Sequence, residues 1–400
     1  MPLAWRPAHD CVVGLYQCVP SSRALARGGG NPRRARHSAV PPHPRVAQWG
    51  RSVDARGAGR PGAKGTVMNT DPSCPVCDRH DWQPLGTRTY ELAAAARLPE
   101  YVRARYDVLF SVWVPGAAEV RMASVLCRHC GFAAFTPRPS EADLDAKYRY
   151  LARHELSRGE MNISLASDAV RSEELAAAIL TTASPEGRRL LDYGGGNGRL
   201  LGRFQALGFD CAVCDYVTET RPGVERLGST LDEIPPDRAF DLVICSHVLE
   251  HLAEPRRILA RLVDLLAPGG LLYAEVPLEI WDGAPLPPEP VTHINFFAPH
   301  SFEALCDGLP VEVLECREHA YTNENGRRLP AVRLLIRRRA SGAPWRSDRR
   351  AAASKTLAYV RPSVVAWLRR YGRYPDLRPV MRSAFVRRHL PQRFFWRFAS

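Results

Sequence analysis

The sequence predicts an α/β fold in which a mostly parallel sheet is covered by helices on both faces. Two observations lead to this prediction. Between residues 168 and 277, short apolar runs typical of buried strands alternate with helical periodicity across short connections. The first of these runs, 190–193, enters a cluster of glycines from which a helix starts. Because such a loop brings backbone close to a ligand, we expect a nucleotide-cofactor site at this strand end.

The individual strands follow from branched apolar residues bounded by turn signals. Strands are predicted over 190–193, 211–215, 240–246 and 271–277, with a short third strand near 229–231. Two further runs, 311–321 and 331–339, are joined through Asn325-Gly326, which is a hairpin signal. We therefore expect an antiparallel hairpin to close the otherwise parallel sheet.

Helices are expected between the strands. One is predicted over 168–181, and another over 254–266, with Pro255 in its first turn and Pro268-Gly269-Gly270 ending it. Ahead of these, the Ser-x-x-Asp pattern of residues 140–143 predicts the capped start of a shorter helix.

The glycine loop has an unusual spacing. It reads Asp192-Tyr193-Gly194-Gly195-Gly196-Asn197-Gly198. A dinucleotide fingerprint, G-x-G-x-x-G, would need a glycine at 199, where the chain has Arg199. Pyrophosphate is therefore not the favoured ligand. A G-x-G-x-G loop preceded by an acid instead resembles motif I of the class I S-adenosylmethionine-dependent methyltransferases.

A second stretch resembles the same family. Residues 240–252, Phe-Asp-Leu-Val-Ile-Cys-Ser-His-Val-Leu-Glu-His-Leu, and the Pro268-Gly269-Gly270 turn are similar to the segment after strand four and the turn before strand five. The resemblance covers about residues 165–340. It implies a Rossmann-like, seven-stranded methyltransferase sheet with S-adenosylmethionine as the cofactor.

The resemblance also implies the cofactor site. Asp215 ends the second predicted strand, about 20 residues after the loop, where a carboxylate can accept both ribose hydroxyls; a helix cap is the alternative role. Asp192 would hold the loop and the amino group of the cofactor. Adenine is expected near Leu231 and Asp232. The expected cofactor-binding residues are Asp192, Gly194, Gly196, Gly198, Asp215, Leu231, Asp232, Ser246 and His247.

Residues 292–299, Thr-His-Ile-Asn-Phe-Phe-Ala-Pro, resemble the His-x-Asn-aromatic-Phe-x-Pro stretch of zinc-ribbon methyltransferases in sugar and surface-polysaccharide pathways. A hydroxyl acceptor benefits from a base, and histidine titrates near neutral pH. His293 is the first candidate, followed by His247 and His251, although each can instead be a histidine that only fixes a loop. The expected acceptor is a small molecule or glycan, with O-methylation favoured over C-methylation.

Four cysteines form two Cys-x-x-Cys pairs, at Cys74 and Cys77 and at Cys127 and Cys130. Four thiolates suit tetrahedral Zn²⁺, so we expect a structural zinc ribbon, with a redox pair as the less favoured alternative. His80 and His129 rank below the four thiols as ligands. Runs 106–114 and 120–126, separated by Pro115-Gly116, predict a hairpin that carries the second pair.

Charge is divided unevenly along the chain. Residues 1–67 carry a net +9 and residues 341–400 a net +12, so the middle carries −8 of the total of +13. An acidic core is a poor partner for nucleic acid, whose binding depends on neutralising phosphates. RNA methylation, with ribbon and tail gripping phosphate, is the rival enzyme hypothesis, and a non-catalytic cofactor-binding protein is the other rival.

These patterns divide the chain into four regions. They are a disordered basic arm (1–67), for which Met68 is an alternative start, a zinc-ribbon module (68–150), a methyltransferase domain (151–340) and a basic, aromatic, helical tail (341–400). Aromatic residues of the tail either cover the sheet or contact an anionic membrane surface. With no apolar run long enough to span a bilayer and no signal-peptide core, a cytoplasmic protein is expected.

Overall fold

The computed structural model describes residues 73–92, 95–97, 106, 110, 112–153, 165–217, 219–281, 283–285, 293–323 and 326–373. The predicted basic arm, the alternative start at Met68 and the tail beyond residue 373 lie outside these residues. Among the helices of the described part, none is long and apolar enough to cross a membrane.

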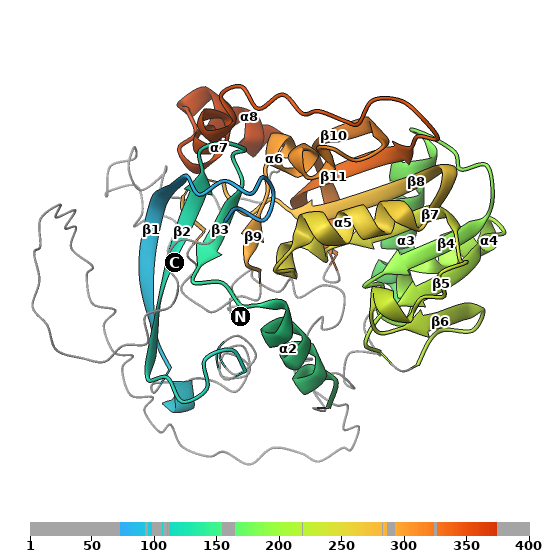
Figure 1. Cartoon of the computed structure of the whole chain (residues 1–400), viewed down its shortest axis with the longest axis horizontal. Coiled ribbons are helices and arrows are strands. Elements are labelled where there is room, and N and C mark those ends of the chain that lie inside the picture. Colours follow the sequence, from blue (N-terminus) through green and yellow to red (C-terminus); the bar gives the residue numbers. More distant parts are fainter. Residues whose placement is uncertain are drawn as a thin grey trace, which may run out of the picture. The chain divides into compact units, whose positions relative to one another are not determined.

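A seven-stranded sheet forms the larger part of the fold (Figure 1). Its strands, in spatial order, are β10 (Val311–Thr322), β11 (Arg328–Arg338), β8 (Leu266–Pro277), β7 (Phe240–Ser246), β4 (Arg189–Tyr193), β5 (Asp210–Cys214) and β6 (Val224–Gly228). Strands β4 to β8 pair in parallel, whereas β11 is antiparallel to both β8 and β10. The predicted Rossmann-like fold, with its closing hairpin, is confirmed.

Alternate residues of the strands build two separate cores, as the pleat requires. On one face, Leu190 and Ile244 pack with helices α3 (Leu165–Leu180) and α4 (Gly202–Ala206). On the other face, Leu191 and Val243 belong to the core that includes helix α5 (Pro255–Asp264). The shorter helices are α6 (Pro299–Glu303), η1 (Ala95–Arg97), η5 (Arg199–Leu201), η6 (Leu231–Glu233), η7 (Leu249–His251) and η8 (Ala304–Cys306).

A second, antiparallel sheet holds the cysteine pairs. Its strands, in order, are β1 (Trp82–Glu91), β2 (Glu119–Cys127), β3 (Ala133–Thr136) and β9 (Asn295–Phe296). Strand β9 comes from the segment that follows β8, far along the chain. One hydrophobic core runs from Cys74 and Phe132 to Val332 and Ile336. The segment after β8 therefore contributes a strand to the smaller sheet, and the two sheets share one core.

The hairpin predicted over 106–114 and 120–126 is wrong in its first strand. Strand β2 pairs with β1 instead, and the described residues between 106 and 114 belong to no strand. Tyr106 and Phe110 pack against Tyr90 of β1. Pro84 and Gly86 argue against a strand in sequence, but the register shifts between them, so a bulge accommodates both residues.

The third strand of the larger sheet was also misplaced by the sequence prediction. It is β6, at 224–228, and the predicted position 229–231 leads into η6. Strand β6 is a short edge strand in which Glu225 and Arg226 are exposed. No strand among the described residues pairs with its outer edge, and it lacks the apolar run that marks a buried parallel strand.

Helix α2 (Glu141–Arg153) begins where the capping pattern predicts. The backbone N–H of Asp143 donates to the Ser140 hydroxyl at 3.2 Å, and the N–H of Ser140 donates to the Asp143 carboxylate at 2.7 Å. This reciprocal arrangement satisfies two donors at the helix start.

The described part of the tail forms two helices, α7 (Ala352–Val360) and α8 (Val364–Arg373), and α7 packs on the rest of the protein. Thr356 of α7 donates to the carbonyl of Gly131, beside the second cysteine pair, at 2.6 Å. Trp345 and Tyr359 are partly buried against the large core. These two aromatic residues therefore cover the body of the protein, while α8 exposes Val364, Val365 and Leu368.

Asn295 ties the two sheets together. Its amide donates to the carbonyls of Leu249 and Leu252, each at 2.7 Å, and its carbonyl accepts from Arg138 at 2.8 Å. Arg138 also donates to the carbonyl of Ile294 at 3.3 Å. Asn295 is 1% exposed, so water cannot replace these contacts. The segment around residue 293 is thereby held against η7.

Replacing Asn295 should destabilise the protein. In Asn295→Ala two carbonyl oxygens lose their donor, which should cost about 2 to 4 kcal/mol of unfolding free energy. Asn295→Asp should be no better, since its carboxylate would face two carbonyl oxygens. Denaturant unfolding measures both changes, and wild-type stability of the aspartate variant would contradict this account.

Candidate functional site

The glycine loop is shaped by contacts that leave no room for a β-carbon. Gly194 has φ +73°, and a Cβ there would lie 2.4 Å from Cγ2 of Val248. At Gly195 a Cβ would lie 2.1 Å from the Asp192 carboxylate. Gly195 was not among the predicted site residues, although it stands in the middle of the three-glycine run. The loop can therefore pass directly over the acid that ends β4.

Asp215 follows β5 and faces this loop. Its carboxylate accepts the backbone N–H of Gly196 at 2.8 Å and that of Val217 at 3.0 Å. The residue is 3% exposed, and burial raises the pKa of Asp215 to about 7 in spite of these hydrogen bonds. Each carboxylate oxygen keeps a second lone pair for a further donor.

Asp192 is equally buried, at 3% exposure. Burial, followed by the negative charge of Asp215, raises the pKa of Asp192 to about 8. Two neighbouring carboxylates whose pKa values are both raised favour a ligand that brings hydroxyl donors and a positive charge.

A cavity of about 270 Å³ opens beside these residues. The sequence-predicted residues that line it are Gly194, Asp215, Leu231, Asp232, His247 and His251. Asp192, Gly196, Gly198, Ser246 and His293 do not line it, although the first three belong to the loop at its edge. Most of the predicted site residues thus come together at the carboxyl ends of β4, β5 and β7, where open α/β sheets bind ligands.

Leu231 and Asp232 occupy different places at this cavity. Leu231 is buried in the wall. The Asp232 side chain is 80% exposed and forms an ion pair with Arg261 of α5 at 2.6 Å. Leu231 therefore gives the cavity wall an apolar surface, while Asp232 lies at the rim of the cavity.

Helix α2 provides a wall of the cavity that sequence reasoning missed. Leu144, Asp145 and Tyr148 line it, and the Tyr148 ring stacks on Tyr216 with centroids 5.5 Å apart. The Tyr216 hydroxyl donates to Asp145 at 3.0 Å. The capping pattern predicts this helix but carries no information on what the helix faces.

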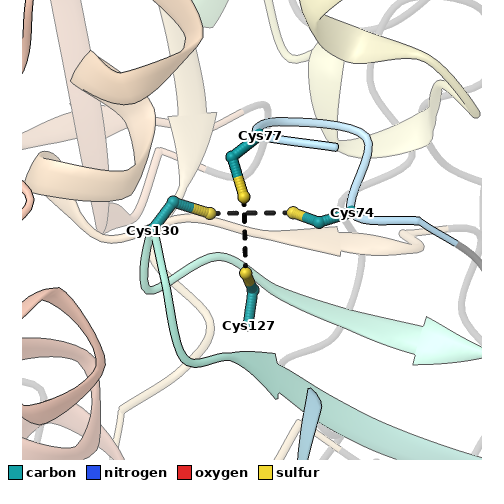
Figure 2. A group of neighbouring side chains, drawn as sticks. All are labelled: Cys74, Cys77, Cys127 and Cys130. Atoms are coloured by element: carbon teal, nitrogen blue, oxygen red, sulfur yellow. Dashed lines mark hydrogen bonds between the residues drawn. The ribbon is translucent and has the colours of Figure 1, made fainter. Parts of the chain in front are cut away.

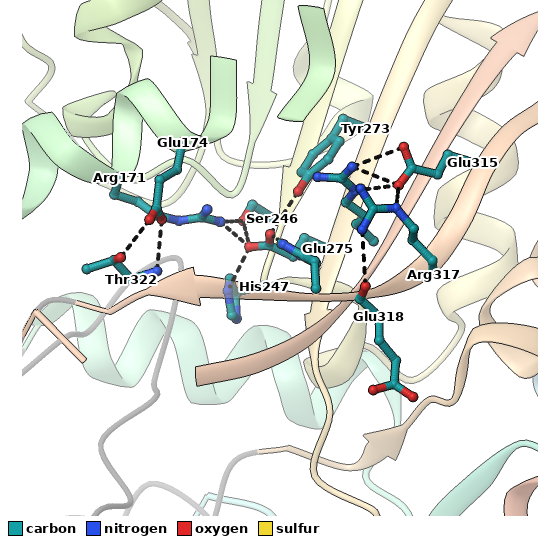
Figure 3. Close-up of polar contacts among 12 residues, drawn as sticks. Arg171, Glu174, Ser246, His247, Tyr273, Glu275, Glu315, Arg317, Glu318 and Thr322 are labelled. Carbon is teal, nitrogen blue, oxygen red and sulfur yellow. Dashed lines mark hydrogen bonds and ion pairs between the residues drawn. The ribbon is translucent and has the colours of Figure 1, made fainter. Parts of the chain in front are cut away.

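Ser246 points into a buried polar network instead of the cavity. Figure 3 shows Arg171, Ser246, Tyr273 and His247 gathered around the Glu275 carboxylate. Ser246 donates to it at 3.1 Å and Tyr273 at 2.8 Å, and Arg171 forms a buried ion pair with it. Burial alone would raise the pKa of Glu275, but Arg171 and the nearby histidines hold it well below its usual range.

His247 connects this network to the cavity. Its Nε2 lies 3.1 Å from Glu275 and its Nδ1 lies 3.5 Å from Glu250. The backbone of His247 is left-handed, with φ +58°, a conformation that non-glycine residues adopt uncommonly and that often marks functional sites. Burial disfavours the cation, but the two carboxylates outweigh it and raise the pKa of His247 to about 9.

His251, His293 and Glu250 form a second cluster beside it. The rings of His251 and His293 meet edge to face, 4.6 Å apart. Nδ1 of His293 lies 2.7 Å from the Glu279 carboxylate. Glu279 and Glu250 raise the pKa of His293 against the opposing effect of burial. All three predicted base candidates therefore gather at one side of the cavity, although only His247 and His251 line it.

The four predicted cysteine ligands come together in the smaller sheet. Figure 2 shows their sulfurs pointing toward a common centre. Sγ of Cys74 lies 3.6 Å from that of Cys130, and Sγ of Cys77 lies 3.6 Å from that of Cys127. A tetrahedral ion with Zn–S bonds of about 2.3 Å requires sulfurs about 3.8 Å apart. The cluster therefore has the dimensions of a four-thiolate metal site.

Two bacterial relatives match parts of this chain. Ubiquinone biosynthesis O-methyltransferase from Rickettsia bellii is 30% identical to this chain over 93 residues, a match that covers 20% of this chain and 39% of that protein. The protein of the same name from Xanthomonas axonopodis pv. citri is 31% identical over 118 residues, covering 26% and 47%. The chain thus spans less than half the length of these relatives.

Solved structures of similar architecture have low identity. The 1,6-didemethyltoxoflavin-N1-methyltransferase of Burkholderia thailandensis has a TM-score of 0.39 and 16% identity, covering 52% of this chain and 96% of its own. N-methyltransferase NodS from Bradyrhizobium japonicum has a TM-score of 0.32 and 15% identity, covering 50% and 97%.

A family model described as "Methyltransferase domain" matches residues 168–315. These residues include the glycine loop, Asp215 and the histidine cluster, and they extend into β10 of the seven-stranded sheet. Residues 168–315 of this chain are therefore similar to a methyltransferase domain, and they fold on a Rossmann-like sheet.

Proposed function

We propose that the protein transfers a methyl group from S-adenosylmethionine to a hydroxyl group of a small-molecule or glycan acceptor. The observation that carries the proposal is the position of Asp215. A buried carboxylate, held by the glycine loop at the carboxyl end of β5, lines a cavity whose other wall holds His247 and His251.

The residues present fit the cofactor. Asp215 has the free lone pairs to accept the two ribose hydroxyls, and Leu231 offers an apolar surface for adenine. Asp192 would attract the amino group, directly or through water, because a positive charge relieves the repulsion between the two acids. The backbone at Gly194 can approach the bound molecule closely, since no side chain intervenes.

Methyl transfer is an in-line displacement at carbon, so the protein mainly aligns the acceptor oxygen with the methyl group and sulfur. The acceptor must also lose a proton. His293, His247 and His251 are the proposed residues for this step, and Glu279 and Glu275 fix the orientation of His293 and His247 respectively. Because the pKa values of His293 and His247 are raised, each can accept the proton only in its neutral form, which becomes more populated as pH rises. The name of the curated relatives supports oxygen as the methylated atom.

The rival functions receive less support. RNA methylation needs a cationic surface, whereas the middle of the chain carries a net −8. The two arginines at the cavity, Arg257 and Arg261, are paired with Glu141 and Asp232. A non-catalytic cofactor-binding protein does not account for three histidines beside the cavity. C-methylation remains the second chemistry for the same site. Contact of the tail with an anionic membrane would fall on Val364, Val365 and Leu368 of α8.

We further propose that the four cysteines bind a structural Zn²⁺. Four protein ligands leave no open coordination position, so the ion would stabilise the fold and not catalyse. Thr356 of α7 donates a hydrogen bond to the carbonyl of Gly131, which follows the second cysteine pair. Loss of the ion should therefore also weaken the packing of α7.

The Asp215→Ala variant should bind S-adenosylhomocysteine at least tenfold more weakly than the wild type, because two ribose hydroxyls lose their acceptor. Calorimetric titration measures the change. Asp237→Ala, which removes an exposed acid elsewhere, is the matched control and should bind normally. Equal affinity in all three proteins would refute the cofactor site.

Cofactor affinity should depend on pH. The pKa of Asp215 is raised to about 7, and only the ionised carboxylate accepts both hydroxyls. Affinity for S-adenosylhomocysteine should therefore weaken about tenfold for this group as pH falls from 8 to 6. In Asp215→Asn, the plot of affinity against pH should be less steep, because one fewer proton is taken up as binding weakens. An unchanged slope in that variant would assign the effect to another group.

The Cys127→Ser variant should lose one equivalent of zinc per chain relative to the wild type and unfold at lower denaturant concentration. Cys211→Ser is the matched control, since Cys211 is a buried cysteine of the other sheet. Elemental analysis after gel filtration gives the metal content. Retention of the full zinc content by Cys127→Ser would exclude the four-thiolate site.

A further inference from the structure

The second histidine cluster has the composition of a metal site. One ligand atom from each of Glu250, His251 and His293 lies within 4.8 Å of the other two. Each of the three residues is at most 2% exposed. Two imidazoles and one carboxylate are a ligand set that transition metals such as zinc and iron use when coordination positions must stay open.

Glu279 orients His293 as carboxylates orient the histidine ligands of metal sites. A carboxylate only accepts hydrogen bonds, so Nδ1 of His293 carries the proton that is directed at Glu279, 2.7 Å away. Nε2 then has its lone pair free. This carboxylate–histidine arrangement is the usual outer shell of a metal-bound imidazole.

The atoms that would coordinate the ion lack hydrogen-bond donors. Among the described residues, no donor forms a hydrogen bond to either carboxylate oxygen of Glu250, and Nε2 of His293 has no hydrogen-bond partner. The ion-pair partners of Glu250 among the described residues are two imidazoles, His247 at 3.5 Å and His251 at 3.7 Å. Burial of a carboxylate without hydrogen bonds is costly, and a metal ion bound directly to its oxygens would offset that cost more fully than imidazoles at these distances.

The backbone holds the three ligands in place. The N–H of Ile294 donates to the carbonyl of Glu250 at 2.9 Å, which fixes His293 beside η7. Asn295 binds both ends of the same turn through the carbonyls of Leu249 and Leu252. If the three ligand atoms held an ion with metal bonds of about 2.1 Å, they would lie roughly 3 to 3.4 Å from one another. Side-chain rotations that move these atoms by about an ångström would therefore complete the site.

We propose that Glu250, His251 and His293 bind a divalent first-row transition-metal ion whose open positions take the acceptor oxygen. The inference rests on the proposed function for its purpose, since His251 lines the cofactor cavity. The ion lowers the pKa of the acceptor hydroxyl, and its proton leaves to solvent, so that with the ion bound His251 and His293 act as ligands and not as bases. The oxygen lone pair then forms the bond to the methyl carbon, and the electron pair of the broken carbon–sulfur bond remains on sulfur.

Two measurements on the full chain, with zinc bound in the ribbon, test the site. The loss of the free Mn²⁺ resonance signal on titration reports binding to nitrogen and oxygen ligands, because Mn²⁺ competes poorly for thiolates. Metal content after equilibration with Zn²⁺ and gel filtration reports total stoichiometry. We expect a second equivalent of metal beyond that of the ribbon in the wild type.

Three variants and a matched control locate that second equivalent. Glu250→Gln and His293→Gln should abolish it, and Glu279→Gln should weaken Mn²⁺ binding about 10- to 100-fold through the orientation of His293. His300→Gln changes a half-buried histidine outside the cluster, whose ring is hydrogen-bonded to Thr356, and should leave metal binding intact. Affinity for S-adenosylhomocysteine, measured on each protein, checks that the variants are folded.

A wild-type protein that binds no Mn²⁺ and holds only the ribbon zinc would overturn the proposal without the use of any variant. So would a second equivalent that survives in both Glu250→Gln and His293→Gln. Failure of the wild type to bind S-adenosylhomocysteine would instead overturn the proposed function. The two proposals can therefore fail separately.

Discussion

A buried carboxylate, Glu275, organises the histidine side of the cavity. It is fully buried near the end of β8 and contacts Arg171 of α3, Ser246 at the end of β7, His247 after that strand, and His319 of β10 at 2.7 Å. Removing one partner would leave an uncompensated buried charge, which is strongly destabilising. The carboxyl ends of these strands are therefore locked together, and His247 is held in its left-handed conformation at the cavity wall.

The proposed cofactor side and the proposed acceptor side of the cavity are built by different means. Glycines and backbone N–H groups shape the loop around Asp215, whereas side-chain pairs position the histidines. Asn295 of the smaller sheet binds Arg138 and the turn that carries Glu250 and His251. The module that holds the four cysteines is therefore connected to the histidine side of the cavity, although its cysteines do not line it.

Sequence alone predicted the parts whose signals are local. The order of strands, the glycine loop and the acid after β5 follow from spacing, and the four cysteines from their pairing. Strand β1 was not predicted because Pro84 and Gly86 are unfavourable in a regular strand. The bulge that accommodates them is defined only by the pairing of β1 with β2. The cavity wall formed by Tyr148 and the network around Glu275 depend on contacts between distant segments, which no periodicity encodes. His293 was predicted, but its pairing with Glu279 and its closeness to Glu250 required the fold.

The central claim is that the cavity beside Asp215 holds S-adenosylmethionine with its reactive end toward the histidines. A crystal structure of the chain grown with S-adenosylhomocysteine tests this most directly. The account predicts both ribose hydroxyls within hydrogen-bonding distance of the Asp215 carboxylate, adenine against Leu231 and the sulfur on the side of His247 and His251. Ribose bound away from Asp215, or a sulfur directed away from these histidines, would contradict it.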